Sequence, residues 1–170
     1  MSQTTVQEYR DPYVQGQIHN PNIADTQEAI VDDSNPIYPG YTVIQGTDPD
    51  DISVPIAAFT FDEIRGIVTW SGQAKEKSLY TGVNYFEDDD PLTLLKRGLI
   101  AVTLGGTVAK GDTAFFVHTA GGASAQWTYR NDLDTDKASE IPATFEAAGI
   151  SGDIVLVRFT IDAAIAKILT

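Results

Sequence analysis

The sequence predicts an all-β protein, a small β-barrel or β-sandwich, with an extended N-terminal arm before it. Short apolar and aromatic segments follow one another from residue 36 onward and are separated by Gly, Pro, Asn and Asp, which is typical of barrels and sandwiches. The stretch 98–117, GLIAVTLGGTVAKGDTAFFV, packs apolar strands around glycine turns. Residues 1–35 differ from the rest, because they are rich in Gln, Asn, Asp and Thr and contain only scattered apolar residues.

We therefore divide the chain into an arm, residues 1–35, and a β-barrel or sandwich domain, residues 36–170. Fixing the backbone of an arm costs about 1–2 kcal/mol per residue, so an ordered arm needs neighbouring subunits to offset that cost. A flexible tail is the alternative. The candidate contacts with a neighbour are the spaced apolar and aromatic residues of the arm, Val6, Tyr9, Tyr13, Val14, Ile18 and Ile23.

The first strands of the domain are read from alternation and turn residues. In IYPGYTVIQG, the pair Pro39-Gly40 is a type II turn signal followed by a strand. The segment 52–61, ISVPIAAFTF, alternates like a strand, and Pro55 places it at a sheet edge or a bulge. The segments 64–72, IRGIVTWSG, and 79–86, LYTGVNYF, are rich in β-branched and aromatic residues, which favour strands.

The segment 88–98, DDDPLTLLKRG, has two interpretations. Asp90 as N-cap, Pro91 at the first helical position and Gly98 at the end describe a short helix over Pro91–Arg97. A strand over Leu92–Leu95 followed by a Lys-Arg-Gly turn describes a hairpin. The sequence favours the hairpin, because so short a helix is marginal and a strand follows at once.

The last third of the chain continues the pattern of strands and turns. We expect the glycine pairs Gly105-Gly106 and Gly121-Gly122 to supply positive φ in hairpin turns. The clearest strand is DIVLVRFTID, residues 153–162, and the closing AAIAKILT is a helical turn or a docking strand. One face of the clearest strand carries Val155, Val157, Phe159 and Ile161.

Composition and charge exclude several classes of function. The chain has 170 residues, 42% of them hydrophobic, which suits one domain with a real core. Its formal net charge is -13, which disfavours binding to a phosphate backbone. It contains no cysteine, which excludes disulfides, thiolate catalysis and Cys-zinc sites. No apolar stretch resembles a signal peptide or a membrane span, so we expect synthesis in the cytoplasm and no membrane partner.

No side-chain pattern predicts catalytic, cofactor-binding or metal-binding residues. His19 and His118 have no local companions in the sequence. Asp132, Asp134 and Asp136 open like a calcium loop, but Lys137 stands where glycine is needed and Ala143 where a bidentate Glu belongs. A solvated loop is therefore favoured over a weak divalent-ion site. The aromatic residues Tyr80, Tyr85, Trp70, Trp127 and Tyr129 favour a core or an interface over a sugar-binding platform.

The order of these segments resembles the small cement, or decoration, proteins of tailed bacteriophage heads. The resemblance is carried by IYPGYTVIQG, then FDEIRGIVTWS, then LLKRGLIAVTLGGTVAKGDTAFFVHTAGG, and finally IPATFEAAGISGDIVLVRFTI. It covers the chain from about residue 36 and, less completely, the arm.

The resemblance implies a structural virion protein with no enzymatic activity and no cofactor. Such a protein binds the outside of the expanded head between major capsid protein subunits and stabilises the shell against internal DNA pressure. It implies a homotrimer or, as the second choice, a homodimer. The alternative functions are a carbohydrate- or receptor-binding head-fibre module, for which exposed aromatics would serve, and a small β-barrel enzyme that uses His118 or the 132–136 loop.

Overall fold

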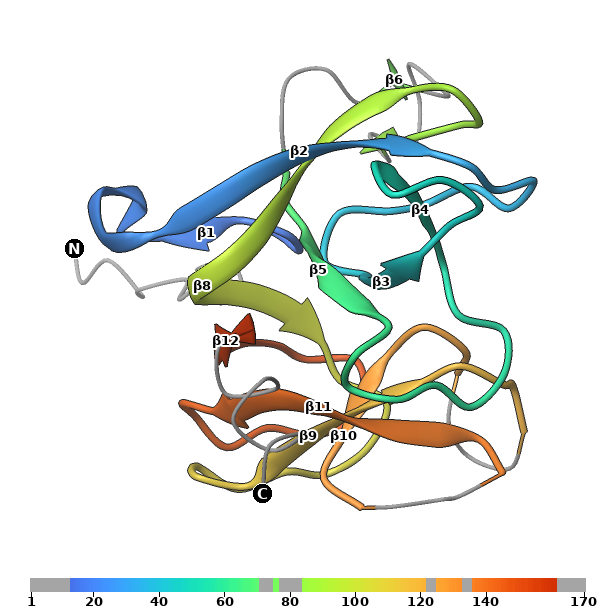
Figure 1. Ribbon diagram of the computed structural model, residues 1–170. Helices are drawn as coiled ribbons and strands as arrows, with labels where there is room; N and C mark the ends of the chain where they lie inside the picture. Colours follow the sequence, from blue (N-terminus) through green and yellow to red (C-terminus); the bar gives the residue numbers. More distant parts are fainter. Residues whose placement is uncertain (1–12, 71–74, 77–83, 122–124, 133–135, 162–170) are drawn as a thin grey trace, which may run out of the picture.

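Nearly all the regular structure of the protein is β, which confirms the predicted fold class (Figure 1). The computed structural model describes residues 13–70, 75–76, 84–121, 125–132 and 136–161. Along the chain these form β1 (Ile18–His19), the short 3₁₀ helix η1 (Pro21–Ile23), β2 (Asp25–Val31), β3 (Thr42–Gln45), β4 (Asp51–Ser53), β5 (Ile64–Val68), β6 (Lys75–Glu76), β7 (Asn84–Tyr85), β8 (Pro91–Thr103), β9 (Thr113–Val117), β10 (Tyr129–Arg130), β11 (Ala138–Phe145) and β12 (Ile154–Thr160).

Five of these strands close into a barrel. Its strand order is β8-β2-β4-β3-β5, and β5 pairs back with β8 through Ile67 opposite Leu95 and Val68 opposite Leu94. The pairing of β2 with β4 is parallel, and the other barrel pairings are antiparallel. Because the barrel is closed, strands far apart in sequence share one interior, which is filled by aliphatic side chains.

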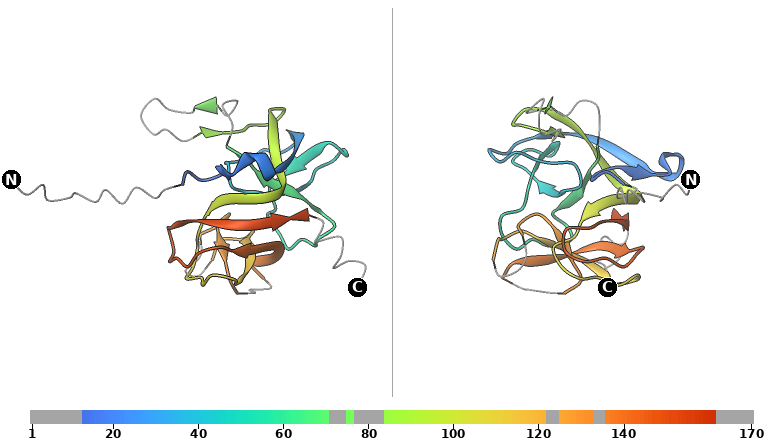
Figure 2. Two further views of the ribbon diagram at one scale, coloured as in Figure 1. Left: turned by 90° about the vertical axis from the view of Figure 1, so that its left-hand side faces the viewer. Right: turned by 180° about the vertical axis from the view of Figure 1, so that it is seen from behind.

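The second half of β8 leaves the barrel and begins a second sheet. It pairs with β12 from Thr103 opposite Ile154 to Arg97 opposite Thr160, and the order continues through β11, β9 and β10. A bridge between Leu104 and Tyr129 brings β10 back to the end of β8. Figures 1 and 2 show the barrel as one layer and this sheet as a second layer beneath it.

The long strand β8 decides the ambiguity at residues 91–97. These residues are strand, so the helix alternative is wrong, and the turn predicted at Lys96-Arg97-Gly98 is also wrong because the strand continues through it. Gly98 has φ 144°, and a Cβ at this position would lie 3.3 Å from the Cβ of Ala24. The glycine therefore lets β8 change direction and exchange β5 for β12 as its neighbour, instead of ending the strand.

The core is continuous between the two layers. Phe116, Phe145 and Phe159 of the second sheet belong to the same buried cluster as the barrel residues. The fully buried Tyr129 joins the layers, because its hydroxyl lies 2.9 Å from Thr42 Oγ1 and donates a 2.6 Å hydrogen bond to the carbonyl oxygen of Gly40. Since β8 also runs through both layers, they behave as one packed unit.

The predicted turns are partly confirmed. Gly40 has φ 87°, and the Tyr41 N–H donates a 3.2 Å hydrogen bond to the carbonyl of Tyr38, as a type II turn requires. Gly105, Gly106 and Gly121 do not have positive φ, which contradicts the prediction for these turns, and Gly122 lies outside the described residues. A Cβ on Gly105 would lie 2.1 Å from Thr128 Oγ1, so this glycine serves a close approach.

Part of the predicted arm lies in the barrel. β1 pairs with β8 through Ile18 opposite Ile100, and β2 lies between β8 and β4. Ala29 and Val31 point into the core, whereas Glu28 and the apolar Ile30 are exposed, so the burial alternates although the residue types do not. The segment predicted as an arm, residues 1–35, therefore contains a strand of the barrel, β2.

The predicted strand over 52–61 is short, because regular pairing ends with β4 at Ser53. The next N–H, from Val54, donates a 2.8 Å hydrogen bond to the Asp33 carboxylate instead of a strand neighbour, and Pro55 follows. The predicted strand over 153–162 is confirmed as β12, with Val155, Val157 and Phe159 buried. The C-terminal segment 163–170 lies outside the described residues.

Candidate interfaces

The first described residues of the predicted arm form a turn at the edge of the second sheet. Tyr13 contacts His19 edge to face, with ring centroids 5.9 Å apart, and lines a groove of about 390 Å³ with residues 146–148 and 153–156. The side chain of Val14 is 58% exposed, and its carbonyl accepts a 2.9 Å hydrogen bond from the Gln17 N–H. Tyr13 and Val14 are thus held close to the surface of β12, where a neighbour can reach them.

The other arm candidates have different surroundings. Ile18 is half-buried in β1 and packs against the core of its own molecule. Ile23 is 60% exposed in η1 and lines a groove of about 300 Å³ whose floor includes Leu99 and Phe159 and whose rim carries Arg97 and Arg158. Val6 and Tyr9 lie outside the described residues. The structure therefore presents Tyr13, Val14 and Ile23 at the surface, and their role as contacts stays a prediction.

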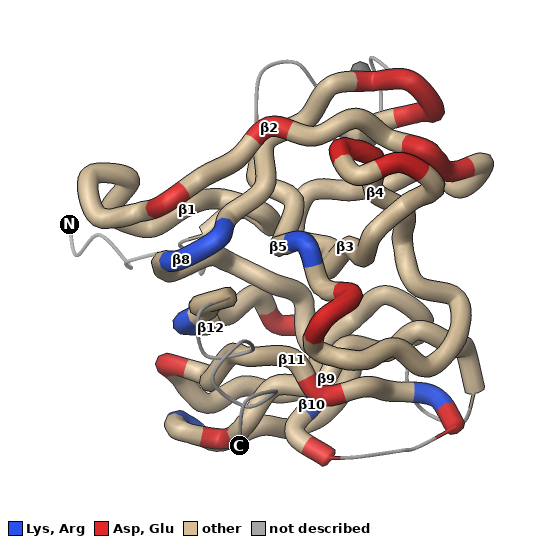
Figure 3. The backbone as a smooth tube through the Cα atoms, in the orientation of Figure 1, with Lys and Arg blue, Asp and Glu red and all other residues tan. Residues whose placement is uncertain are grey.

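Negative charge gathers at the end of the barrel away from this groove (Figure 3). It comes from the loops around β4 and before β8, whereas Lys96 and Arg97 lie together on β8. The acidic residues of these loops are Asp32, Asp33, Asp48, Asp50, Asp51, Glu87, Asp88, Asp89 and Asp90. Charge is thus distributed unevenly over the described surface, with an acidic end and a basic stretch at the bend of β8.

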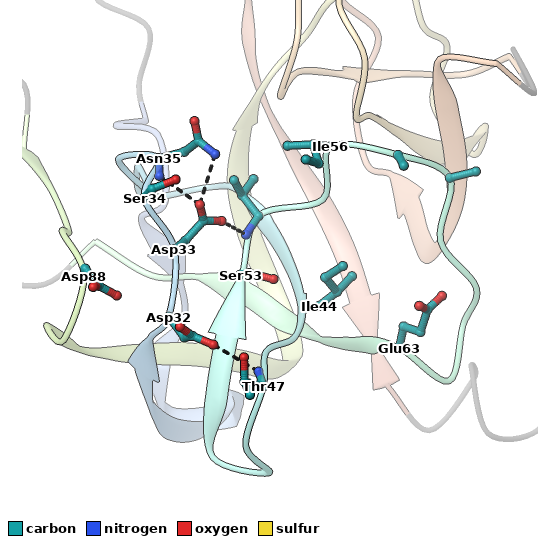
Figure 4. Close-up of a pocket in the computed structure, with 13 residues that line it drawn as sticks. Asp32, Asp33, Ser34, Asn35, Ile44, Thr47, Ser53, Ile56, Glu63 and Asp88 are labelled. Atoms are coloured by element: carbon teal, nitrogen blue, oxygen red, sulfur yellow. Dashed lines mark hydrogen bonds between the residues drawn. The ribbon is translucent and has the colours of Figure 1, made fainter.

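The acidic end contains an open hollow of about 590 Å³ (Figure 4). The Asp33 carboxylate accepts hydrogen bonds from the Asn35 N–H at 2.8 Å and from the Val54 N–H at 2.8 Å. The Asp32 carboxylate accepts a 3.1 Å hydrogen bond from the Thr47 N–H. Hydrogen bonds from Thr47 hold the pKa of Asp32 below its usual value, so this group is charged at neutral pH.

These carboxylates hold loops in place through hydrogen bonds to main-chain N–H groups. The hydrogen bonds of Asp33 fix the loop after β2 to the end of β4. The hollow also has an apolar wall that includes Ile56, which is 64% exposed. The hollow therefore places charged and apolar surface side by side.

The basic stretch on β8 is partly engaged inside the molecule. Lys96 Nζ donates a 2.6 Å hydrogen bond to the carbonyl oxygen of Arg65. Burial, with the Arg65 charge as a smaller cause, lowers the pKa of Lys96. Arg97, the next residue, is exposed at the rim of the groove beside Ile23. Arg97 is thus the member of the pair that offers its charge to the surface.

Among the described residues, no group of three or more His, Asp or Glu side chains could hold a metal ion. His118 is buried at the end of β9, where its Nδ1 lies 2.8 Å from Thr119 Oγ1 and its ring packs on Phe59. Asp132 pairs with Arg130 at 2.5 Å, and Asp134 lies outside the described residues. No helix in the described part of the chain is long and apolar enough to cross a membrane.

The aromatic residues that could bind a sugar are dispersed. Tyr85 and Tyr129 are buried, and Trp127 packs on Tyr41 with ring centroids 5.5 Å apart. Trp70 is 51% exposed, and its main-chain N–H donates a 2.7 Å hydrogen bond to the carbonyl of Gly16. Tyr80 lies outside the described residues. Buried placement of Tyr85 and Tyr129 agrees with the predicted core role.

The described part of the chain is thus a closed barrel with an attached sheet, surface grooves and an uneven charge distribution. The chain belongs to the phage cement family, since residues 2–160 match the model described as "Structural cement protein (E217 gp24/Pam3 gp6)". It is therefore a structural protein associated with the phage capsid.

We compared the chain with two solved structures that match it. A chain from "The capsid of Myoviridae Phage XM1" has a TM-score of 0.68 and 15% identity, and the match covers 94% of this chain and 97% of that chain. A chain from "The crystal structure of head fiber gp8.5 N base in bacteriophage phi29" has a TM-score of 0.43 and 12% identity, with 82% and 96% covered. Among curated protein sequences, none matches this chain. The first likeness shows the fold, and the second is too weak to support an argument.

Sequence reasoning missed two surface features that the structure assembles. The acidic hollow brings together residues 32–35, 53–54, 56–58 and Asp88, which are distant in the chain. The strand β2 was hidden in the segment predicted as an arm. The three apolar residues Ala29–Val31, which follow a run of polar residues, are the signal that could have found it.

Proposed function

We propose that this protein binds the outer surface of the expanded phage head, between neighbouring subunits of the major capsid protein. There it stabilises the shell against internal DNA pressure without catalysing a reaction. The observation that carries the proposal is the family match over residues 2–160. It includes the barrel, the second sheet and the residues before Tyr13.

The charge of the protein supports the outer location. A formal net charge of -13 repels the phosphate backbone of packaged DNA, so the outside of the shell is the favourable side. The partner is neutral or basic where it meets the acidic end of the barrel. Basic residues of the major capsid protein at that contact would then complete the charge balance.

The contacts we propose are Val6, Tyr9, Tyr13, Val14, Ile18 and Ile23. Of those that the structure describes, Val14 and Ile23 support the proposal best because their aliphatic side chains are more than half exposed. The protein also contacts itself, as a homotrimer at local three-fold points or, as the second choice, a homodimer. Each copy needs to contribute only a few kcal/mol, because many copies act together on one shell.

The first test is the copy number in purified particles. Mass spectrometry of heads gives the ratio of this chain to the major capsid protein. A ratio near one, or a simple fraction set by the lattice, is expected of a cement protein. A handful of copies points to a fibre, and absence from particles contradicts the proposal.

A second test addresses the outer surface. Intact heads are treated with a non-specific protease, and the loss of this chain is compared with that of a known internal protein. Selective digestion of this chain is expected. Full protection until the shell is opened contradicts the outer location.

A further inference from the structure

One barrel strand is paired on both sides over only a small part of its length. β2 pairs with β8 from Asp25 to Ile30, but it pairs with β4 only at Ile30 and Val31. Within the described residues, no strand pairs with the side of residues 25–29 that faces away from β8. β4 begins only at Asp51 and so does not extend along residues 25–29 of β2. Before Asp51 the chain forms a turn, in which the Asp51 N–H donates a hydrogen bond to the carbonyl of Asp48.

The hydrogen bonds at the end of β2 show which main-chain groups point away from β8. The Val31 N–H donates to the carbonyl of Asp90 at 3.0 Å, on the side of β8. The Ile30 N–H donates to the carbonyl of Asp50 at 3.2 Å, on the side of β4. Since main-chain groups alternate along a strand, those of Thr26 and Glu28 face the same side as those of Ile30, where β4 is absent.

The side chains around this edge are open to solvent as well. Residues 25–28 are exposed in succession on both faces of the strand, and Ile30 is 45% exposed on the face that carries Thr26 and Glu28. An edge whose main-chain groups have no strand partner among the described residues, and whose faces are exposed, can accept a further strand. We call residues 25–29 with this orientation the β2 edge.

We propose that the β2 edge binds an extended, basic segment of the shell protein as an added β-strand. This inference rests on the proposed function, since it names the surface through which the shell is held. Thr26 and Glu28 supply the main-chain hydrogen bonds, and Ile30 supplies an apolar contact.

Charge decides the kind of segment. The edge carries the Asp25 and Glu28 carboxylates and leads into the acidic loop of Asp50 and Asp51, whereas Arg97 lies opposite Asp25 in the register with β8. Lys or Arg side chains of an added strand would face these carboxylates. The β2 edge of a second copy is disfavoured as the occupant, because it would bring the same carboxylates together.

The test compares two changes at Glu28. Glu28→Pro removes the outward N–H and places a ring in the path of the added strand, and the bonds of β2 to β8 do not require that N–H. Glu28→Thr is the matched control, since it removes the same charge and keeps the N–H. Binding of each full-length protein is titrated on expanded shells assembled without this protein. We expect Glu28→Pro to bind at least tenfold more weakly than Glu28→Thr.

Equal binding of the two variants would overturn the β2 edge as the docking site and leave the proposed function intact. Failure of the unsubstituted protein to bind shells would overturn both. If Glu28→Pro does not fold, hydrogen exchange of the unsubstituted protein decides. The amides of Thr26 and Glu28 should exchange at least tenfold more slowly on shells. Exchange that is unchanged on shells overturns the proposal. Protection of these amides that rises with the concentration of the free protein also overturns it, since it assigns the edge to a second copy of this chain.

Discussion

Replacing Tyr129 by Phe tests how the two layers are joined. The substitution keeps the ring, whose centroid lies 5.1 Å from that of Phe116, and removes only the hydroxyl. That hydroxyl contacts Thr42 Oγ1 at 2.9 Å and the Gly40 carbonyl at 2.6 Å, and Thr42 and Gly40 are both buried. Tyr129→Phe therefore leaves buried polar groups without the partner that the hydroxyl provided.

The size of the effect follows from these contacts. Each net hydrogen bond contributes about 1 kcal/mol, and a buried group left without a partner adds to the cost, so we expect a loss of roughly 2–3 kcal/mol. For a chain of this size this lowers Tm by roughly 5–10 °C, measured by calorimetry. Thr42→Val should cost less, because Tyr129 keeps its bond to Gly40. In the double-mutant cycle, the coupling between Tyr129 and Thr42 should be roughly 0.5–1.5 kcal/mol. A Tm within 1 °C of the unsubstituted protein would refute this reasoning.

The same substitution changes the alkaline stability. Burial raises the pKa of Tyr129 above its usual value of 10.0, so the folded protein keeps the neutral phenol while the unfolded chain ionises. The unfolded state then binds fewer protons, and this group lowers stability by about 1.4 kcal/mol for each pH unit above about 10. The difference in stability between the protein and Tyr129→Phe should therefore shrink between pH 10 and 11. A constant difference would contradict the burial of this phenol.

Three further predictions concern the barrel and its surface. Gly66→Ala should lower the free energy of unfolding, measured with denaturant, by about 3 kcal/mol, since its Cβ would lie 2.7 Å from a main-chain oxygen of β8. Gly111→Ala is the control: it meets only the strain of φ 90° and should cost about 1–2 kcal/mol. Equal costs would contradict the close approach of β5 to β8. Deleting residues 1–12 should leave the Tm of the free protein nearly unchanged and reduce its retention on heads. Deleting residues 1–35 should abolish cooperative unfolding, because this deletion removes β2. A cooperative transition in the longer deletion would show that β2 is dispensable. Arg158→Ala should leave Tm unchanged within error, because its ion pair is exposed to solvent, and a clear loss would show that the pair contributes to the fold.

The strands that the sequence predicted best are those with a strong local pattern. β12 alternates buried and less buried residues with period two, and β9 follows the glycine turn at Gly111, where φ is 90°. The type II turn at Gly40 also depends on local chemistry alone. Such features need only a few neighbouring residues, so they can be read without the rest of the fold.

The sequence was less informative where a long-range partner decides the outcome. The helix caps at Asp90 and Gly98 are sound local signals, yet residues 91–97 are strand because β2 and β5 pair with them on either side. Gly105 resembles a positive-φ turn residue in the sequence, but glycine is needed at this position because Thr128 packs closely against it. His118 is buried by elements distant in sequence, so its position at a strand end gave no indication of burial.

The sequence alone determined the all-β class, the excess of negative charge and the absence of cysteine chemistry, because these follow from composition and short-range alternation. Only the tertiary structure decided that β2 belongs to the barrel, that β8 serves both layers and that the β2 edge has no strand partner among the described residues. The reason is that pairing depends on segments brought together from far apart: Thr26 lies opposite Leu95, while the short β4 reaches only Ile30 and Val31. The surfaces available to a capsid are set by those pairings rather than by any local motif.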